Sequence, residues 1–157
     1  MKKVLLFLFL TKCLFANVDF YSQYDDIFKK YEKQYGISYF LMKSIAITEN
    51  ANFDENAIMY NTNGTKDIGL MQINTSWKHW MPEAGITNEK LKDVDFNIKV
   101  AFMIVDKIIQ QHGYSWDAIG RYHSGTPKYK KVWLKRIKEN VKYLASIDNR
   151  VKILASN

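Results

Sequence analysis

Apolar residues recur at helical spacing through most of the chain. The stretch from Asp19 to Tyr35 carries them on one helix face, and Gly36 is a suitable stop. This face consists of Phe20, Tyr24, Ile27, Phe28, Tyr31 and Tyr35. Ser38 is a favourable N-cap for a second helix, which is mostly apolar and ends at Glu49.

The second half of the chain predicts three more helices. Residues 95–112, followed by Gly113, are apolar on most faces, which indicates a central buried helix. Ser115 caps a short helix that continues through Tyr122. Pro127 suits the first turn of a final helix, because its missing N–H would be unpaired there. One stripe of that helix carries Val132, Trp133, Ile137, Val141 and Leu144.

The segment between these two groups of helices has a weaker pattern. Asn50 to Gly64 is rich in Asn and predicts an irregular loop. Asp67 to Asn74 fits either a short strand or an extended turn. A chain of 157 residues without repeats or linkers predicts one domain with a single core. We therefore expect a mainly α domain with at most a small hairpin.

The first 16 residues have the pattern of a secretory signal. Lys2 and Lys3 give a positive start, Val4–Leu10 is unbroken and apolar, and Ala16 is a small residue suited to cleavage. The apolar run is shorter than the roughly 20 residues that cross a membrane. We expect a signal peptide at 1–16, a mature domain at 17–157 and a periplasmic protein that does not span the membrane once processed. Cys13 invites lipid attachment, but a preceding lysine fits that signal poorly.

Cleavage would also change the charge and redox chemistry of the chain. It removes three lysines, lowers the formal charge from +7 to +4, and removes Cys13, the only cysteine. Such a protein suits a polyanionic partner in the cell envelope. Nucleic acid is disfavoured, because 128–131 is the only dense basic cluster and is better explained as a solvated helix face. The three histidines lack a ligand spacing, so no metal or cofactor is expected.

Glu49 and Asp67 are the carboxyl groups best placed for chemistry. Glu49 ends an apolar helix, and such surroundings favour the protonated form that an acid catalyst needs. Asp67 follows 18 residues later and opens the segment Asp67-Ile68-Gly69-Leu70-Met71-Gln72-Ile73-Asn74. Glycosidic bond cleavage uses one carboxyl as an acid, and a second can stabilise or capture the cationic sugar. A lone glutamate at a helix end is otherwise an ordinary solvated residue.

Three segments together resemble the soluble lytic transglycosylase family of peptidoglycan-cleaving enzymes. They are Glu49–Phe53, Asn61–Asn74 with its Gly-Leu-Met-Gln-Ile run, and Gly120–Gly125. The resemblance covers roughly Tyr31 to Val141 and implies a lysozyme-like fold. It also implies peptidoglycan glycan strands as the substrate.

Two details narrow the resemblance. The loop Asn56–Gly64 and the Tyr-His-Ser sequence at 122–124 look like small transglycosylases that accompany type III and type IV secretion and conjugation machines. A component of such a trans-envelope apparatus is therefore an expected partner. The stretch Asn61–Trp77 also resembles animal lysozyme, in which the aspartate matching Asp67 is the second catalytic carboxylate.

By this resemblance Glu49 performs both proton transfers of a lytic transglycosylase. It protonates the oxygen between N-acetylmuramic acid and N-acetylglucosamine, then accepts the proton of the muramoyl 6-hydroxyl as a 1,6-anhydro ring closes. Asp67 is either a second catalytic carboxylate or a cap for the turn before Gly69. A hydrolytic muramidase using both acids is one alternative, and a non-catalytic glycan-binding assembly factor is another.

The remaining candidates are binding residues, each with a structural alternative. Gly69 allows sugar or backbone to approach closely, or is an ordinary turn glycine. Gln72 and Asn74 can hydrogen-bond N-acetyl and hydroxyl groups, or cap the loop. Met71 fits a core filler better than a ligand contact.

Two further candidates lie near the end of the short helix, next to departures from the family pattern. The Tyr122 hydroxyl can point toward Glu49 or an N-acetyl group, or belong to a core aromatic with a solvated tip. His123 is a sugar contact or a surface histidine. The departures are Asn50, Ile68, His123 and Ser124, where the family usually has Ser, an aromatic residue, Asn and Ala. None of these departures removes a proton donor.

Overall fold

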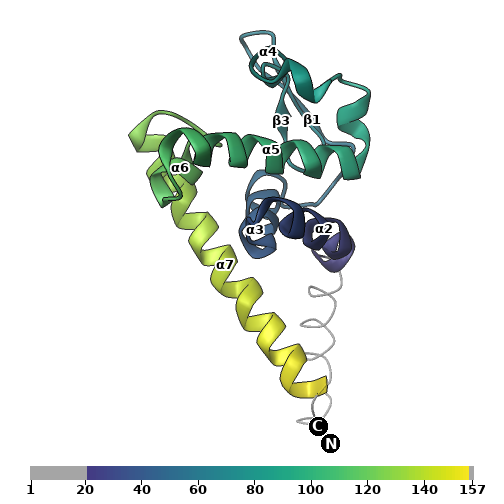
Figure 1. The fold of residues 1–157 in the computed structure, drawn as a ribbon, viewed down its shortest axis with the longest axis vertical. Coiled ribbons are helices and arrows are strands. Elements are labelled where there is room, and N and C mark those ends of the chain that lie inside the picture. The colour runs from purple at the N-terminus through teal and green to yellow at the C-terminus, as the bar shows by residue number, and fades with distance from the viewer. Residues whose placement is uncertain (1–20, 156–157) are drawn as a thin grey trace, which may run out of the picture.

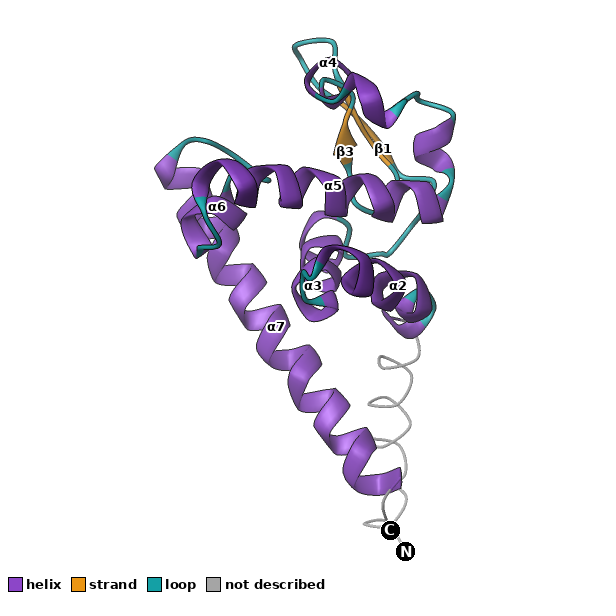
Figure 2. Ribbon diagram, viewed as in Figure 1, coloured by secondary structure: helices purple, strands orange, loops and turns teal. Residues whose placement is uncertain are grey.

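The computed structural model describes residues 21–155, with side chains as far as 148. The predicted signal peptide at 1–16 lies outside the described residues. The described chain is mainly helical, with one small sheet (Figures 1 and 2). The elements are α2 (Asp25–Tyr35), α3 (Tyr39–Glu49), β1 (Ile58–Tyr60), β2 (Lys66–Ile68), β3 (Ile73–Asn74), α4 (Trp77–Trp80), η1 (Pro82–Ala84), η2 (Lys90–Lys92), α5 (Val94–His112), α6 (Trp116–Gly120) and α7 (Pro127–Ala155).

Helices α2 and α3 meet at a tight corner. Gly36 takes the left-handed conformation at φ 68°, and its N–H donates to the carbonyl of Glu32, which confirms the predicted stop. Ser38 lies at the N-cap position of α3, but its side chain makes no capping hydrogen bond. The Glu32 carboxylate instead accepts the Tyr39 N–H at 2.9 Å. Glu32, from the preceding helix, therefore accepts a backbone N–H at the start of α3 in place of Ser38.

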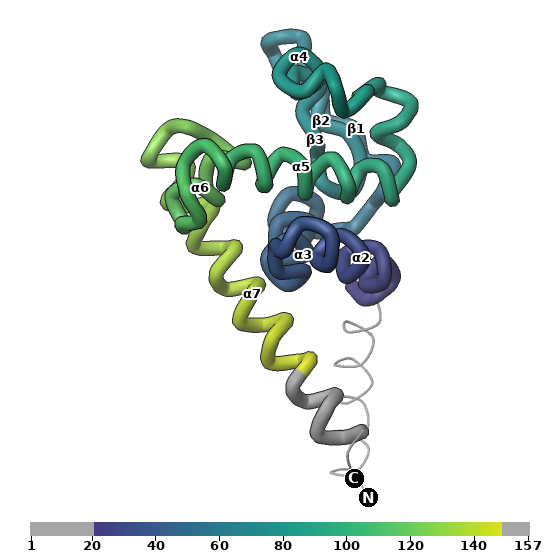
Figure 3. Tube along the Cα trace, viewed as in Figure 1, coloured from purple at the N-terminus to yellow at the C-terminus, as the bar shows by residue number. Residues whose placement is uncertain are grey.

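Helix α5 is the central buried helix that the pattern predicted. It crosses between the part that carries the sheet and the part that carries α2 and α3 (Figure 3). Its start is fixed by Asp93, whose carboxylate accepts the Phe96 N–H at 2.7 Å. The buried residues of α5 are Asn97, Ile98, Val100, Ala101, Phe102, Ile104, Val105 and Ile108. Asn97 is the one polar residue in this set.

The sheet is larger than the hairpin we expected. Strands β1, β2 and β3 are antiparallel and lie in that order, with Asp67 opposite both Met59 and Asn74. Strand β1 falls inside the predicted loop 50–64. All three of its residues are exposed, so it lacks the alternation of buried and exposed positions that identifies a strand.

The last two helices lie close to their predicted limits. Ser115 caps α6 by accepting the Ala118 N–H at 3.1 Å, but α6 ends at Gly120, before Tyr122. In α7, Trp133, Ile137 and Leu144 are buried, and Val141 is half-buried; Val132 is 57% exposed, so the predicted stripe is too wide by that residue. Among the described helices, none is long and apolar enough to cross a membrane.

Asn97 connects α5 to the turn between β2 and β3. Its amide nitrogen donates to the carbonyls of Ile68 and Leu91, both at 2.9 Å. Its amide oxygen accepts the Met71 N–H at 2.8 Å. The close packing requires Gly69, because a Cβ there would lie 2.4 Å from the Asn97 amide nitrogen and 2.7 Å from the Leu91 carbonyl oxygen.

Gly69→Ala should therefore be much more destabilising than a matched change at Gly36. Both glycines have positive φ, 79° and 68°, so alanine costs about 1–2 kcal/mol of backbone strain at each. A Cβ at Gly36 meets nothing within 4 Å, whereas at Gly69 it adds an overpacking cost of about 1–3 kcal/mol. Urea unfolding of both variants measures the difference. Equal losses of unfolding free energy would contradict the close packing at Asn97.

Candidate active site

A cleft of about 770 Å³ lies where the end of α3, the sheet and the segment after α6 meet. Six of the eight predicted site residues line it: Glu49, Asp67, Gln72, Asn74, Tyr122 and His123. Gly69 packs against Asn97, and Met71 is fully buried, so neither lines the cleft. The structure thus brings together both carboxyl groups and the polar candidates from three separate segments.

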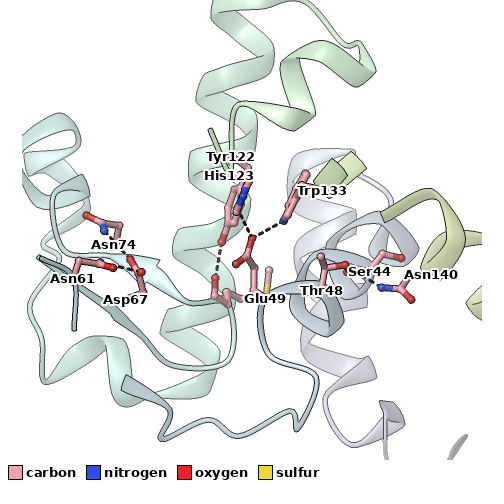
Figure 4. A network of polar contacts seen from close by, with 11 residues as sticks. Ser44, Thr48, Glu49, Asn61, Asp67, Asn74, Tyr122, His123, Trp133 and Asn140 are labelled. Carbon is pink, nitrogen blue, oxygen red and sulfur yellow. Dashed lines mark hydrogen bonds and ion pairs between the residues drawn. The ribbon is translucent and has the colours of Figure 1, made fainter. Parts of the chain in front are cut away.

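Glu49 is the last residue of α3, and its side chain is 19% exposed. Its Oε1 accepts the Trp133 indole N–H at 2.7 Å, and His123 Nδ1 lies 3.5 Å from the same oxygen (Figure 4). The apolar wall expected behind Glu49 is present, because Leu41, Met42, Ile45 and Ala46 are buried. One carboxyl oxygen is therefore engaged by nitrogen groups.

Trp133 is the contact of Glu49 that the sequence did not identify. It is 4% exposed and stacks on His123, with ring centroids 5.5 Å apart and planes 6° apart. Tyr122 stacks on it less closely, at 6.2 Å and 18°. The periodicity of α7 placed Trp133 in the core, which is correct. Its contact with Glu49 joins residues 84 positions apart, and no local pattern reports it.

Tyr122 supports the floor of the cleft, not Glu49 directly. Its hydroxyl donates to the Met71 carbonyl at 2.9 Å. Burial, followed by the negative charges of Glu49 and Asp67, raises the pKa of Tyr122 well above its ordinary value. The hydroxyl therefore stays neutral at any physiological pH and remains a donor.

Asp67 is held by two side-chain amides. The Asn74 amide donates to Oδ1 at 2.7 Å, and the Asn61 amide donates to Oδ2 at 3.0 Å. Figure 4 shows this carboxylate turned toward the two asparagines and away from Glu49. Within the described chain, Asp67 accepts from no backbone N–H of the turn before Gly69. Asp67 therefore does not cap the turn before Gly69 as predicted. It instead holds β2 to Asn61 and Asn74 through hydrogen bonds.

Gln72 and Asn74 combine loop support with exposure to the cleft. Gln72 has φ 48°, a left-handed conformation that costs a non-glycine residue about 1–3 kcal/mol. Its amide nitrogen donates to the Gly69 carbonyl at 2.8 Å and holds this turn. Asn74 also accepts the Ser76 N–H at 2.9 Å. Gln72 and Asn74 therefore support the loop, as their structural alternative predicted, and both also line the cleft.

No group of three His, Cys, Asp or Glu side chains in the described part of the chain is placed to hold a metal ion. The chemistry available from the residues in the cleft is proton transfer by Glu49, negative charge at Asp67 and hydrogen bonding by amides. This is the set of groups that glycosidic bond cleavage uses.

The model of the transglycosylase SLT domain matches residues 26–144. The chain belongs to the transglycosylase SLT family. It is 32% identical to protein IpgF of Shigella flexneri over 132 residues, which cover 83% of this chain and 82% of that protein. It is 33% identical to invasion protein IagB of Salmonella typhimurium, over 81% of this chain and 82% of that protein. The resemblance predicted from the motifs is confirmed.

The SLT family is one of glycan-cleaving transglycosylases that bind peptidoglycan. The structure explains one position at which this chain differs from the family pattern. Asn50, where the family usually has Ser after the glutamate, is 8% exposed. Its amide nitrogen donates to the Asp54 carbonyl at 2.6 Å, and its oxygen accepts the Asp54 N–H at 3.2 Å. The residue closes the loop that leaves α3 and does not contact Glu49 through a hydrogen bond.

Tyr122→Phe tests the role of the buried hydroxyl in this SLT domain. At pH 7 the variant should lose about 1 kcal/mol of unfolding free energy, because the Met71 carbonyl loses its donor. The folded pKa of Tyr122 is raised, so this contribution is complete below the unfolded value of 10.0 and declines as pH rises above it. The difference between wild type and variant should therefore shrink above pH 10.

Urea unfolding at pH 7 and at several values above pH 10 measures this difference. Tyr129→Phe is the matched control, because that ring is 58% exposed on α7 and its loss should change stability little. A difference between wild type and Tyr122→Phe that grows with pH would contradict the neutral buried hydroxyl.

Proposed function

We propose that this protein is a periplasmic lytic transglycosylase that cleaves the β-1,4 bond between N-acetylmuramic acid and N-acetylglucosamine. Its product carries a 1,6-anhydro-muramic end. The observation that carries the proposal is the single half-buried carboxyl of Glu49 at the cleft wall, with one oxygen engaged and the other left for substrate. One such carboxyl is sufficient for both proton transfers.

In this mechanism the proton moves through Glu49 twice. The protonated carboxyl gives its proton to the bridging oxygen while the bond from C1 to that oxygen breaks. The resulting carboxylate removes the proton of the muramoyl 6-hydroxyl while its oxygen bonds to C1. The acid is regenerated, and no water is consumed. Positioned proton transfer of this kind contributes roughly 10²–10⁴-fold in rate.

Asp67 has an electrostatic role in this proposal. Two amide donors hold the carboxylate in place and occupy one lone pair on each oxygen. A carboxylate fixed in this way lowers the energy of a cationic sugar without attacking it. The alternative is a muramidase in which the same bond is cut by water, and the presence of both carboxyl groups in one cleft favours that candidate.

We also propose that the enzyme opens local gaps in the wall for a trans-envelope secretion apparatus, after export by the segment 1–16. The names of the relatives support this setting, because IagB is an invasion protein. A non-catalytic glycan-binding factor is less consistent with the site, because Glu49 keeps both its acid group and its apolar wall.

Mass spectrometry of digested peptidoglycan sacculi tests the reaction. The expected products carry anhydro-muramic ends, lighter than hydrolysed ends by one water. Glu49→Gln keeps the shape of the side chain and removes its titratable proton, so it should abolish cleavage while folding and sacculus binding persist. Reducing muramic ends as the main product would instead establish a muramidase.

Asp67→Asn measures the contribution of the second carboxylate. One oxygen becomes an NH2 group that faces the amide donor of Asn61 or Asn74, so one hydrogen bond is lost as well as the charge. Asn61→Ala is the matched control, because it removes one of these bonds and keeps the charge. We expect Asp67→Asn to lose part of its activity, more than Asn61→Ala, while anhydro products persist. Complete inactivation of folded Asp67→Asn would indicate a lysozyme-like pair.

A further inference from the structure

We infer that Trp133 is a positioning residue for Glu49, acting through its indole N–H. This inference rests on the proposed acid–base role of Glu49 and adds a residue from a different helix to it. Trp133 lies on α7, whereas the family motifs that suggested the site lie on α3, in the sheet and after α6. The final helix is thereby part of the catalytic apparatus.

The hydrogen bond has the geometry of a built contact. The distance of 2.7 Å is short for a nitrogen donor, and the indole is a donor that cannot accept. Trp133 is 4% exposed, so water has little access to compete for its N–H. A bond to a carboxylate at such a position is among the stronger hydrogen bonds in proteins.

This bond distinguishes the two oxygens of Glu49. Oε1 accepts from the Trp133 N–H, which can only donate, so a proton on Oε1 would face that donor. The catalytic proton is therefore placed on Oε2, the oxygen that no described side chain engages by hydrogen bond. In the second half of the reaction the same N–H stabilises the carboxylate and keeps its orientation toward the 6-hydroxyl.

Helix α7 holds Trp133 in register with α3 by a second contact. Two turns further along α7, the Asn140 amide donates to Thr48 Oγ1 at 2.9 Å. Thr48 immediately precedes Glu49, and its hydroxyl donates to the Ser44 carbonyl at 2.7 Å. Two successive residues at the end of α3 are thus each bound by one residue of α7 (Figure 4).

Other charged or titratable groups near Glu49 are limited in the described chain. His123 and Tyr122 come from the segment after α6, and Asp67 comes from β2. On α7, Lys130 is paired with Asp117. Trp133 carries no charge, so its replacement changes hydrogen bonding to Glu49 without changing any charge.

The test replaces the indole of Trp133 by benzothiophene, which has sulfur in place of the N–H and nearly the same shape. With peptidoglycan as substrate, kcat should fall roughly tenfold to hundredfold with little change in KM, as for loss of a hydrogen bond to a charged group. The carboxylate loses a stabilising donor, so the alkaline limb of the pH–rate profile should move to higher pH. A loss of packing alone would not move that limb.

Two controls separate the effect of lost packing from the effect of lost positioning of Glu49. The same replacement at Trp116 should leave kcat and the pH profile unchanged, because Trp116 is 44% exposed and does not line the cleft. Trp133→Phe serves if the benzothiophene variant does not fold. Wild-type kcat and pH profile in a folded Trp133 variant would overturn the inference.

A further measurement is independent of activity. In the wild type, the Trp133 indole proton resonance should shift as Glu49 titrates, and this shift should vanish in Glu49→Gln. If the indole proton responds to Glu49 titration but the protein cleaves no glycan, the contact between Trp133 and Glu49 stands and only the proposed function is refuted. No response of the indole proton to Glu49 titration would refute the positioning contact itself.

Discussion

The three hydrogen bonds of the Asn97 amide are the constraint on which the cleft depends. Two of them attach the end of β2 and the turn after it to the buried helix α5, through the Ile68 carbonyl and the Met71 N–H, and the third holds the Leu91 carbonyl of η2. Ile68, whose carbonyl is held, follows Asp67 directly. Met71, whose N–H is held, gives its carbonyl to Tyr122. The network continues through the Tyr122–Trp133 stack to Glu49, so one buried amide fixes the relative positions of all these groups.

The two carboxyl groups receive different environments from this frame. Glu49 ends an apolar helix and accepts on one oxygen, which leaves the other for proton exchange. Asp67 lies on a strand and accepts a hydrogen bond on each oxygen from a side-chain amide. Separate roles for two acids in one cleft follow from what surrounds each of them, since the side-chain chemistry is the same.

Helices α2, α3, α5, α6 and α7 could be predicted from the sequence because their buried faces repeat at the helical period, whereas the short helices α4, η1 and η2 were not predicted. Glu49 and Asp67 could be found because their motifs are local, and the family resemblance placed them together. Strand β1 could not be found, because none of its side chains is buried. The sequence identified Trp133 only as a core residue, because the helical period indicates that a side chain is buried and not whether its N–H donates a hydrogen bond. Asn97 was not singled out from the sequence, because it is one of several polar residues of α5 and its partners are set by the tertiary structure.

The space above Gly69 has a consequence for how this sequence can change. A Cβ at 69 would meet both the Asn97 amide and the backbone carbonyl of Leu91, and a smaller residue at 97 would remove only the first of these contacts. It would also leave the carbonyls of Ile68 and Leu91 and the Met71 N–H without their partner. Either substitution alone is harmful, and the pair together keeps the clash with the Leu91 carbonyl and leaves three backbone groups without their partner. A compensating change at 97 is therefore no route to a side chain at 69, and the glycine and the asparagine constrain each other physically.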